Sequence, residues 1–198
     1  MPASERDTPR VQAERLHYRD LSAALDLRRV KFIDESGLNL ARPRLYGRAP
    51  RGERALGRAP QHDGQKGPIL GARSCPGLEA GMTVDGATDA DVFRAYVREV
   101  LGPTLRQGDI VIADNLAAHK AAGVQETIAA PGARLLYLPP YSPDLNPIEP
   151  CWSKIKTFLR AAKARTREAL DTAVTSALAT VTASDARAWF AHSGDVLH

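Results

Sequence analysis

Short apolar runs that end at polar residues recur along the chain and predict buried strands. Residues 30–34, VKFID, form one such run, and residues 108–115, GDIVIADN, form a second that is apolar from Ile110 to Ala113. A continuous apolar run of this length is typical of a parallel strand that is covered on both faces. Residues 133–140, ARLLYLPP, repeat the pattern, so we expect a third strand there.

The segments around these runs have other patterns of apolar and polar residues. Residues 67–84 read as two strands around a Pro-Gly turn, and residues 88–101 carry apolar positions at the spacing of an α-helix. Further helices are expected at about 119–130, 149–162, 166–180 and 184–191. Strands that alternate with helices predict an α/β fold.

Two charge-rich segments interrupt this alternation. In residues 1–27 the apolar residues Leu16, Leu21, Ala24 and Leu27 follow a loosely helical spacing, which predicts a short amphipathic helix or connector. Residues 42–58 place six arginines among Gly and Pro with almost no apolar periodicity. This second segment is expected to be a basic loop or an edge hairpin.

Composition narrows the class of protein only slightly. The 198 residues suffice for one domain plus a short extension, and the net charge of +4 with a pI of about 9.3 favours a polyanionic partner. Cys75 and Cys151 stand far apart without the spacing of a zinc site, so both are expected to be reduced thiols. No apolar stretch approaches the roughly 20 residues of a membrane helix, which predicts a cytoplasmic protein.

Three acidic residues stand at the expected ends of elements. Asp34 closes the first apolar run, Asp114 closes the second, and Glu149 begins the helix that follows the Pro-rich segment 139–147. Active sites gather at the carboxyl ends of strands in open α/β sheets. Each residue also has a structural interpretation: the aspartates as turn residues, and Glu149 as the third residue of a capping box that begins at Asn146.

The sequence motifs that contain these acids resemble those of a known family. FIDESG, ADNLAAHK and LLYLPPYSPDLNPIEPCW are similar to the three catalytic motifs of bacterial insertion-sequence transposases of the mariner superfamily, which are DDE-type endonucleases. Thirty-four residues separate Asp114 from Glu149, the spacing typical of that branch. The resemblance runs from about residue 28 to the C-terminus.

The resemblance implies a ribonuclease-H-like mixed sheet flanked by helices, in which Asp34, Asp114 and Glu149 converge. It also implies two Mg²⁺ or Mn²⁺ ions, with Asp34 bridging them and the other two acids each holding one. Carboxylate oxygens are the ligands that such hard cations prefer. Water would release the transposon end, and the freed 3′-hydroxyl would then attack target DNA, at TA dinucleotides in such enzymes. The implied partner is double-stranded DNA in the nucleoid, with a homodimer left open.

Three residues near the acids are not expected to act on DNA. Glu35 is expected on the opposite face of its strand from Asp34, and Trp152 and Tyr141 are expected to pack in the protein rather than to stack on a base.

Several basic residues are candidates for contacts with the DNA. On the helix after Glu149, an apolar stripe faces away from Lys156 and Arg160. The predicted phosphate contacts are Arg42, Arg44, Arg48, Arg51, Arg54, His119, Lys120, Lys156 and Arg160.

The expected organisation is a charged helical connector at 1–27, the remnant of a linker to a missing DNA-binding region, followed by a DDE-type catalytic domain at 28–198. Relatives in the family that the chain resembles usually carry N-terminal helix-turn-helix units, which 27 residues are not expected to hold, so a second hypothesis is a non-catalytic DNA-binding fragment or a regulator of a full-length transposase. A nuclease acting on RNA–DNA hybrids is a third, since a fold does not determine a substrate. Pro150 is expected to delay the start of the helix that carries Glu149.

Overall fold

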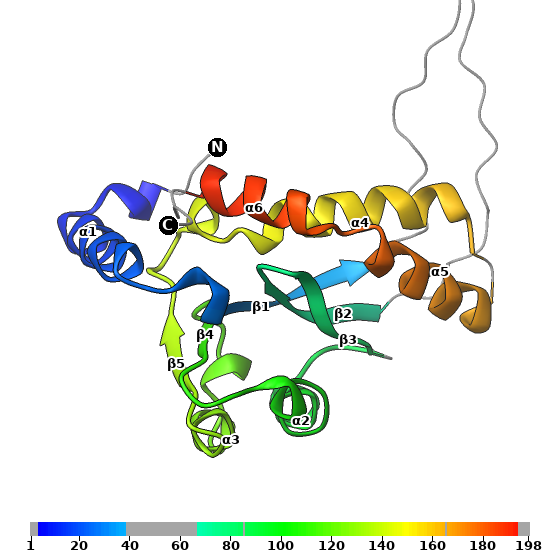
Figure 1. The fold of residues 1–198 in the computed structure, drawn as a ribbon, viewed down its shortest axis with the longest axis horizontal. Helices are drawn as coiled ribbons and strands as arrows, with labels where there is room; N and C mark the ends of the chain where they lie inside the picture. Colours follow the sequence, from blue (N-terminus) through cyan, green and yellow to red (C-terminus); the bar gives the residue numbers. More distant parts are fainter. Residues whose placement is uncertain (1–3, 39–66, 85, 165, 194–198) are drawn as a thin grey trace, which may run out of the picture.

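Five strands form one mixed sheet in the computed structural model, which describes residues 4–38, 67–84, 86–164 and 166–193 (Figure 1). The strands are β1 (Val30–Leu38), β2 (Gly67–Ser74), β3 (Gly77–Thr83), β4 (Ile110–Ala113) and β5 (Arg134–Tyr137). The α-helices are α1 (Pro9–Ala23), α2 (Ala90–Tyr96), α3 (Val124–Ala129), α4 (Ile148–Ala162), α5 (Arg167–Ala179) and α6 (Ala183–His192). A π-helical turn, Val97–Leu101, extends α2.

The sheet has the order β3-β2-β1-β4-β5. β1 pairs with β4 in parallel and with β2 in antiparallel fashion, while β4 and β5 are parallel. All four residues of β4 are buried, as its apolar run predicts for a central parallel strand. The predicted mixed α/β sheet is therefore confirmed, and within it the strand that carries Asp34 lies beside the strand that leads to Asp114.

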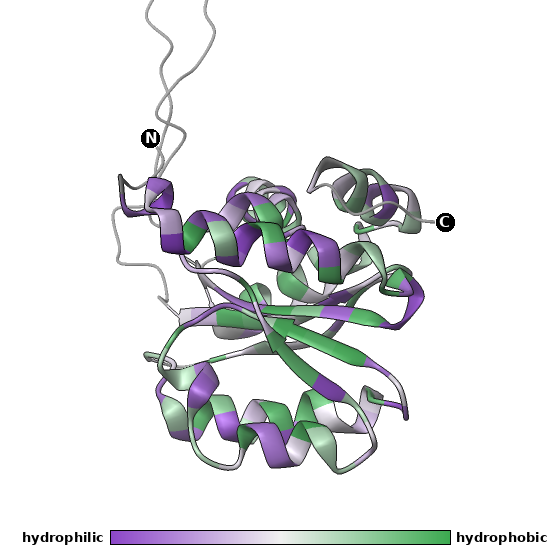
Figure 2. Ribbon diagram, turned by 90° about the vertical axis from the view of Figure 1, so that its left-hand side faces the viewer, coloured by the Kyte–Doolittle hydropathy of each residue, from purple (hydrophilic) through white to green (hydrophobic). Residues whose placement is uncertain are grey.

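Helices cover both faces of the sheet and bury two separate cores. α2 and α3 lie on one face, and α4, α5 and α6 lie on the other, with α1 beside them (Figure 1). Figure 2 shows the hydrophobic strands between these two helical layers. Ile148, Trp152, Ile155 and Leu159 of α4 are all buried in the second layer, which confirms the predicted apolar stripe.

The strand that carries Asp34 is longer than its apolar run suggested. β1 continues to Leu38, so Asp34 lies in its middle rather than at its end. The reason is that β1 pairs with two strands over different parts of its length. Its pairing with β4 stops at Phe32, whereas its pairing with β2 runs from Phe32 to Leu38. Asp34 thus lies two residues beyond the last parallel pair, not at the end of the strand.

The helix expected at 119–130 is divided into two pieces. Ala118–Lys120 forms a 3₁₀ turn, and α3 begins only after Gly123, whose φ of 87° lies in the left-handed region. Glycine adopts such a backbone at little cost, and an α-helix cannot continue through it. The other predicted helices are present, and no described helix combines the length and the apolar character needed to cross a bilayer.

Helix α1 buries a different face from the one expected. Leu16 is 60% exposed, whereas Val11, Arg15 and Tyr18 are buried. The cause is a long-range contact, because the Arg15 guanidinium donates to both carboxylate oxygens of Asp144. The segment predicted as a connector therefore packs on the loop that precedes α4.

Candidate active site

Two aspartates are carried to one edge of the sheet by the pairing of β1 with β4. Phe32 and Ile112 are the last paired residues, and Asp34 and Asp114 each follow two positions further along. Asp34 is buried, and Asp114 is half-buried directly after β4. Because residues two positions apart on a strand share a face, both carboxylates continue the face of the Phe32–Ile112 pair.

The third acid, Glu149, lies in the first turn of α4. Pro147 is the N-cap and Pro150 is the third helical residue, where its missing N–H has no intrahelical partner to lose. The helix therefore begins at Ile148, one residue later than a cap at Asn146 would place it, and the expected late start beside Glu149 is confirmed. Asn146 Oδ1 accepts from Ile148 N at 3.3 Å, but the exposed carboxylate of Glu149 has no hydrogen bond or ion pair within the described ranges. The capping box proposed for Glu149 is therefore not formed.

Asp34 is held by two hydrogen bonds in a buried, negatively charged environment. Its Oδ1 accepts from Glu35 N at 2.8 Å, and its Oδ2 accepts from Trp152 Nε1 at 3.2 Å. Burial, together with the negative charges of Glu149 and Asp114, raises the pKa of Asp34 to about 7 despite these bonds. Glu149 and Asp114 are thus close enough to Asp34 to disfavour its charged form.

Asp114 is held in place by His119, which the sequence had led us to expect as a phosphate contact. Nδ1 of His119 lies 2.6 Å from Asp114 Oδ1, and the His119 side chain is only 1% exposed, with its ring centre 4.2 Å from that of Phe93 at an angle of 32°. Burial acts to raise the pKa of Asp114, but the His119 contact and the hydrogen bond from Leu116 N outweigh it and hold the pKa low. The prediction that His119 contacts phosphate was wrong, because its ring is enclosed by the fold.

The three acids lie near one another without forming a closed ligand cage. Among the described residues, no three His, Cys, Asp or Glu side chains are drawn together closely enough to hold a metal ion. Asp34 instead accepts a hydrogen bond from Trp152, and Asp114 contacts His119. Repulsion between the negative charges of the three carboxylates opposes their closer approach. A cation bound here would have to draw Glu149 towards the aspartates.

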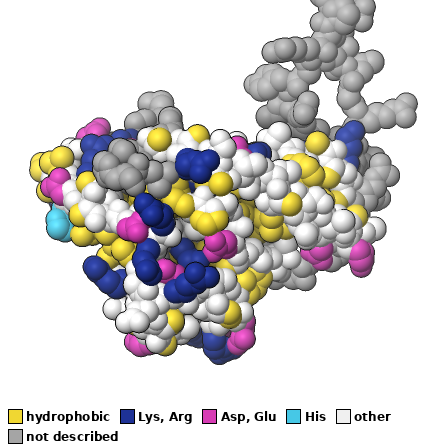
Figure 3. All heavy atoms as spheres, viewed as in Figure 1, with side chains coloured by type: hydrophobic (Ala, Val, Ile, Leu, Met, Phe, Trp, Pro, Cys, Tyr) yellow, Lys and Arg dark blue, Asp and Glu magenta, His cyan; other side chains and the backbone are white. Residues whose placement is uncertain are grey.

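The other predicted DNA contacts fall into two groups. Lys120 is exposed with its ammonium 5.3 Å from the Tyr137 ring centre, Arg160 is exposed, and Lys156 is half-buried. On the face shown in Figure 3, Lys and Arg side chains mingle with Asp and Glu, so the charge of that face does not by itself trace a path for DNA. Arg42, Arg44, Arg48, Arg51 and Arg54 lie outside the described residues.

Two aromatic residues near the site behave differently. Trp152 is 1% exposed and packs in the core, as expected. Tyr141 was expected to pack as well but is 49% exposed, with a φ of 54° that turns its backbone into the left-handed region. The tight Pro-rich turn therefore directs this side chain to the surface.

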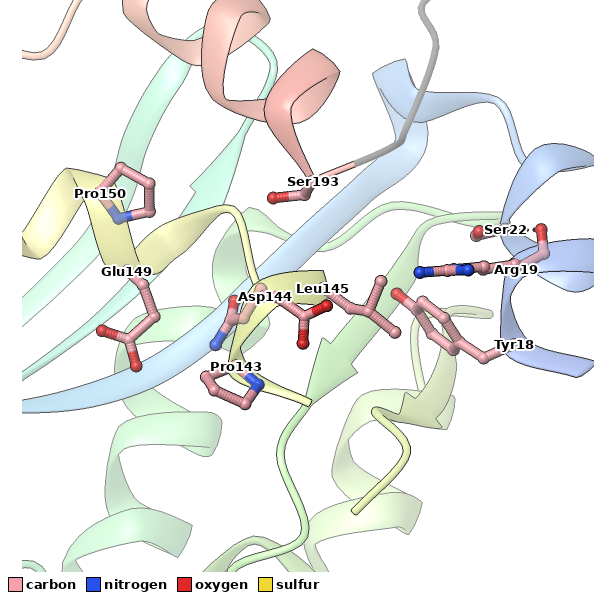
Figure 4. A pocket seen from close by; sticks show the side chains of 10 residues that line it. Tyr18, Arg19, Ser22, Pro143, Asp144, Leu145, Glu149, Pro150 and Ser193 are labelled. Atoms are coloured by element: carbon pink, nitrogen blue, oxygen red, sulfur yellow. Dashed lines mark hydrogen bonds between the residues drawn. The ribbon is translucent and has the colours of Figure 1, made fainter. Parts of the chain in front are cut away.

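Sequence reasoning missed a groove that adjoins Glu149. It has a volume of about 520 Å³ and lies between α1 and the start of α4, with Arg19 on one side and Glu149 on the other (Figure 4). The one available signal was the spacing of Val11, Arg15 and Tyr18, which places a charged residue within a helical stripe.

The raised pKa of Asp34 makes a prediction about the metal-free protein. Because the folded-state pKa of about 7 exceeds the ordinary value, the associated stability is complete below about pH 4 and is lost as the pH rises through 7. In the presence of a chelator, the wild type should lose up to about 4 kcal/mol of unfolding free energy relative to Asp34→Asn between pH 4 and pH 8. Denaturant titrations of both proteins measure this difference, and a constant difference across that range would refute the raised pKa of Asp34.

Comparison with known families gives one sequence match over most of the chain. The family model described as DDE superfamily endonuclease matches residues 29–171. This range includes Asp34, Asp114 and Glu149. No curated protein matches the chain at a significant level.

Solved structures of Mos1 transposase have the same fold. The Mos1 chain in the paired-end complex with the left transposon end gives a TM-score of 0.73 at 18% identity, over 92% of this chain and 58% of that chain. The Mos1 mariner catalytic domain gives a TM-score of 0.64 at 16% identity, over 96% of this chain and 90% of that one. The predicted ribonuclease-H-like fold is confirmed, and this chain spans about three fifths of the Mos1 chain in that complex.

Proposed function

Because the chain belongs to the DDE superfamily endonuclease family, we propose that it is the catalytic domain of a DNA transposase. The proposed reaction is metal-dependent cleavage of phosphodiester bonds at the ends of a mobile element, followed by strand transfer to target DNA. The observation that carries the proposal is the parallel pairing of β1 with β4, which brings Asp34 and Asp114 to one edge of the sheet, with Glu149 near enough to contribute to the raised pKa of Asp34. Paired acids of this kind serve to collect positive charge.

The donor set fits divalent cations. Asp34 is buried, its pKa is raised by burial and by two further carboxylates, and Glu149 has no cationic partner among the described residues. Mg²⁺ keeps several of its waters and needs only one or two carboxylates together with substrate phosphates, so an open arrangement suits it. We propose Asp34, Asp114 and Glu149 as ligands of two Mg²⁺ or Mn²⁺ ions, with Asp34 shared because it interacts with both other acids.

In the proposed reaction the bound ions and the protein side chains have different roles. When bound, the ions supply an activated water and neutralise charge that develops on the phosphoryl group. Trp152 and the Glu35 amide orient the carboxylate of Asp34, and His119 orients that of Asp114. No side chain acts as the nucleophile: water attacks first, and the released 3′-hydroxyl attacks second. The protein therefore contributes position and charge.

The proposed partners follow from the same site. The similar Mos1 structures include complexes with transposon-end DNA and a strand transfer complex, and this supports duplex DNA as the substrate. Lys120, Lys156 and Arg160 remain proposed phosphate contacts. A bacterial insertion-sequence origin, a nucleoid location, a homodimer and the division into a connector and a catalytic domain at residue 28 also remain proposals.

One experiment tests the proposed function directly. Purified protein is incubated with end-bearing duplex DNA, nicked duplex and an RNA–DNA hybrid, each with Mg²⁺, Mn²⁺ or excess chelator. We expect metal-dependent nicking of the DNA duplexes and no product with chelator. Salt-sensitive binding without cleavage would instead favour a non-catalytic fragment, and cleavage confined to the hybrid would favour a nuclease outside transposition.

A further inference from the structure

The groove beside Glu149 joins the candidate active site to a helix that precedes the family match. Tyr18, Arg19 and Ser22 of α1 line one side of it, Glu149 and Pro150 of α4 line the other, and Ser193 after α6 contributes to the rim (Figure 4). Its volume of about 520 Å³ is within the range of sites for small ligands, roughly 300–1,000 Å³. It is thus sized for part of one nucleic-acid strand rather than for a whole duplex.

The α1 side of the groove is held by an ion pair between a buried arginine and an exposed aspartate. Arg15 is 3% exposed and donates to Ser142 Oγ at 2.6 Å and to the two carboxylate oxygens of Asp144 at 3.1 and 2.7 Å. Arg6 donates to the same carboxylate at 3.0 Å. A two-pronged contact between guanidinium and carboxylate fixes orientation as well as distance. Helix α1 is therefore anchored to the loop that leads into α4 and Glu149.

The arginine one turn further along α1 is left with an uncompensated charge. Arg19 is exposed, its side chain extends from α1 towards the groove in Figure 4, and its guanidinium has no ion-pair partner within the described parts of the chain. The nearby acid Asp144 is already paired with Arg15 and Arg6. A free, planar guanidinium on the side of a groove is suited to a phosphate, whose geometry it matches.

We propose that this groove binds one strand of the DNA substrate and that Arg19 contacts a backbone phosphate of that strand. The proposal rests on the proposed function, because the strand is the one whose scissile bond lies at Asp34, Asp114 and Glu149. Arg19 attracts the phosphate to the α1 side, while the negative charge of Glu149 keeps a bare phosphate from settling on the opposite side. The next phosphodiester along the strand is thereby directed to the carboxylates.

The test measures DNA binding, not cleavage. Fluorescence anisotropy gives the affinity of wild type, Arg19→Gln and Arg10→Gln for a labelled single strand, in chelator, over a series of salt concentrations. Arg10 is the matched control, because it is an exposed arginine of the same helix that is paired with Glu14 and lies outside the groove. We expect Arg19→Gln to weaken binding about tenfold and to reduce the salt slope by about 0.7, and Arg10→Gln to change neither.

Three results would overturn the proposal: an unchanged affinity and slope in Arg19→Gln, an equal loss in both variants, or a loss seen with an uninterrupted duplex but not with the single strand. Unchanged circular dichroism and melting temperature exclude misfolding as the cause of a loss. Failure of the groove is distinguishable from failure of the proposed function. If the wild type cleaves DNA and Arg19→Gln binds DNA normally, only the proposed role of the groove is refuted. If Arg19→Gln binds DNA weakly and the wild type does not cleave it, only the proposed catalytic role is refuted.

Discussion

Replacing Asp34 with asparagine is expected to lower metal-dependent DNA cleavage by at least about 1000-fold. Asparagine preserves the shape of the side chain but removes the negative charge. Asp34 is the acid that interacts with both Asp114 and Glu149, so its loss removes the ligand that two ions would share. Asp114→Asn should have an effect of the same order. Initial cleavage rates at saturating Mn²⁺ and calorimetric titration with Mn²⁺ measure the two consequences separately.

Glu35 provides a matched control for this experiment. It is adjacent in sequence and half-buried, but its position on β1 alternates with that of Asp34, so its side chain belongs to the other face of the strand. Glu35→Gln should therefore change the cleavage rate by no more than about twofold. Retention of more than a tenth of the activity in Asp34→Asn, or an equal loss in Glu35→Gln, would contradict the assignment of the shared ligand.

Truncating Trp152 to alanine is expected to cost about 3–5 kcal/mol of unfolding free energy. The indole is 1% exposed within the core that α4 shares with the sheet. It packs so closely over β2 that a Cβ added at Gly71 would lie 2.8 Å from Trp152 Cη2. Alanine would leave a large cavity that a glycine cannot fill. Denaturant titration measures the loss.

The more conservative change at the same position separates packing from positioning. Trp152→Phe keeps most of the volume but removes the N–H that donates to Asp34 Oδ2. Because that bond lowers the pKa of Asp34, the variant should raise this pKa and weaken Mn²⁺ binding at neutral pH. Trp189→Phe is the control, since Trp189 packs near Arg73 away from the acids. Equal Mn²⁺ affinity in wild type and Trp152→Phe would show that Trp152 acts through packing alone.

The candidate site could be predicted in outline because its acids stand beside local signals. Asp34 and Asp114 follow apolar runs, and Glu149 follows a Pro-rich segment that precedes an amphipathic helix. Two details were wrong for one reason: they depended on partners distant in sequence. β1 extends beyond Asp34 because β2 pairs with it, and His119 is buried because it packs against Phe93 and Asp114.

By itself, the sequence determined the types of most elements and the apolar face of α4, and it singled out the three acids as candidates, because these features are encoded in local periodicity and in contiguous motifs. Only the tertiary structure decided which face of α1 is buried, how Asp34 is held and where the groove lies. Arg15 and Asp144 are 129 residues apart, and Asp34 and Trp152 are 118 apart. Contacts over such separations leave no periodic trace in the chain, since they arise from the way the layers pack.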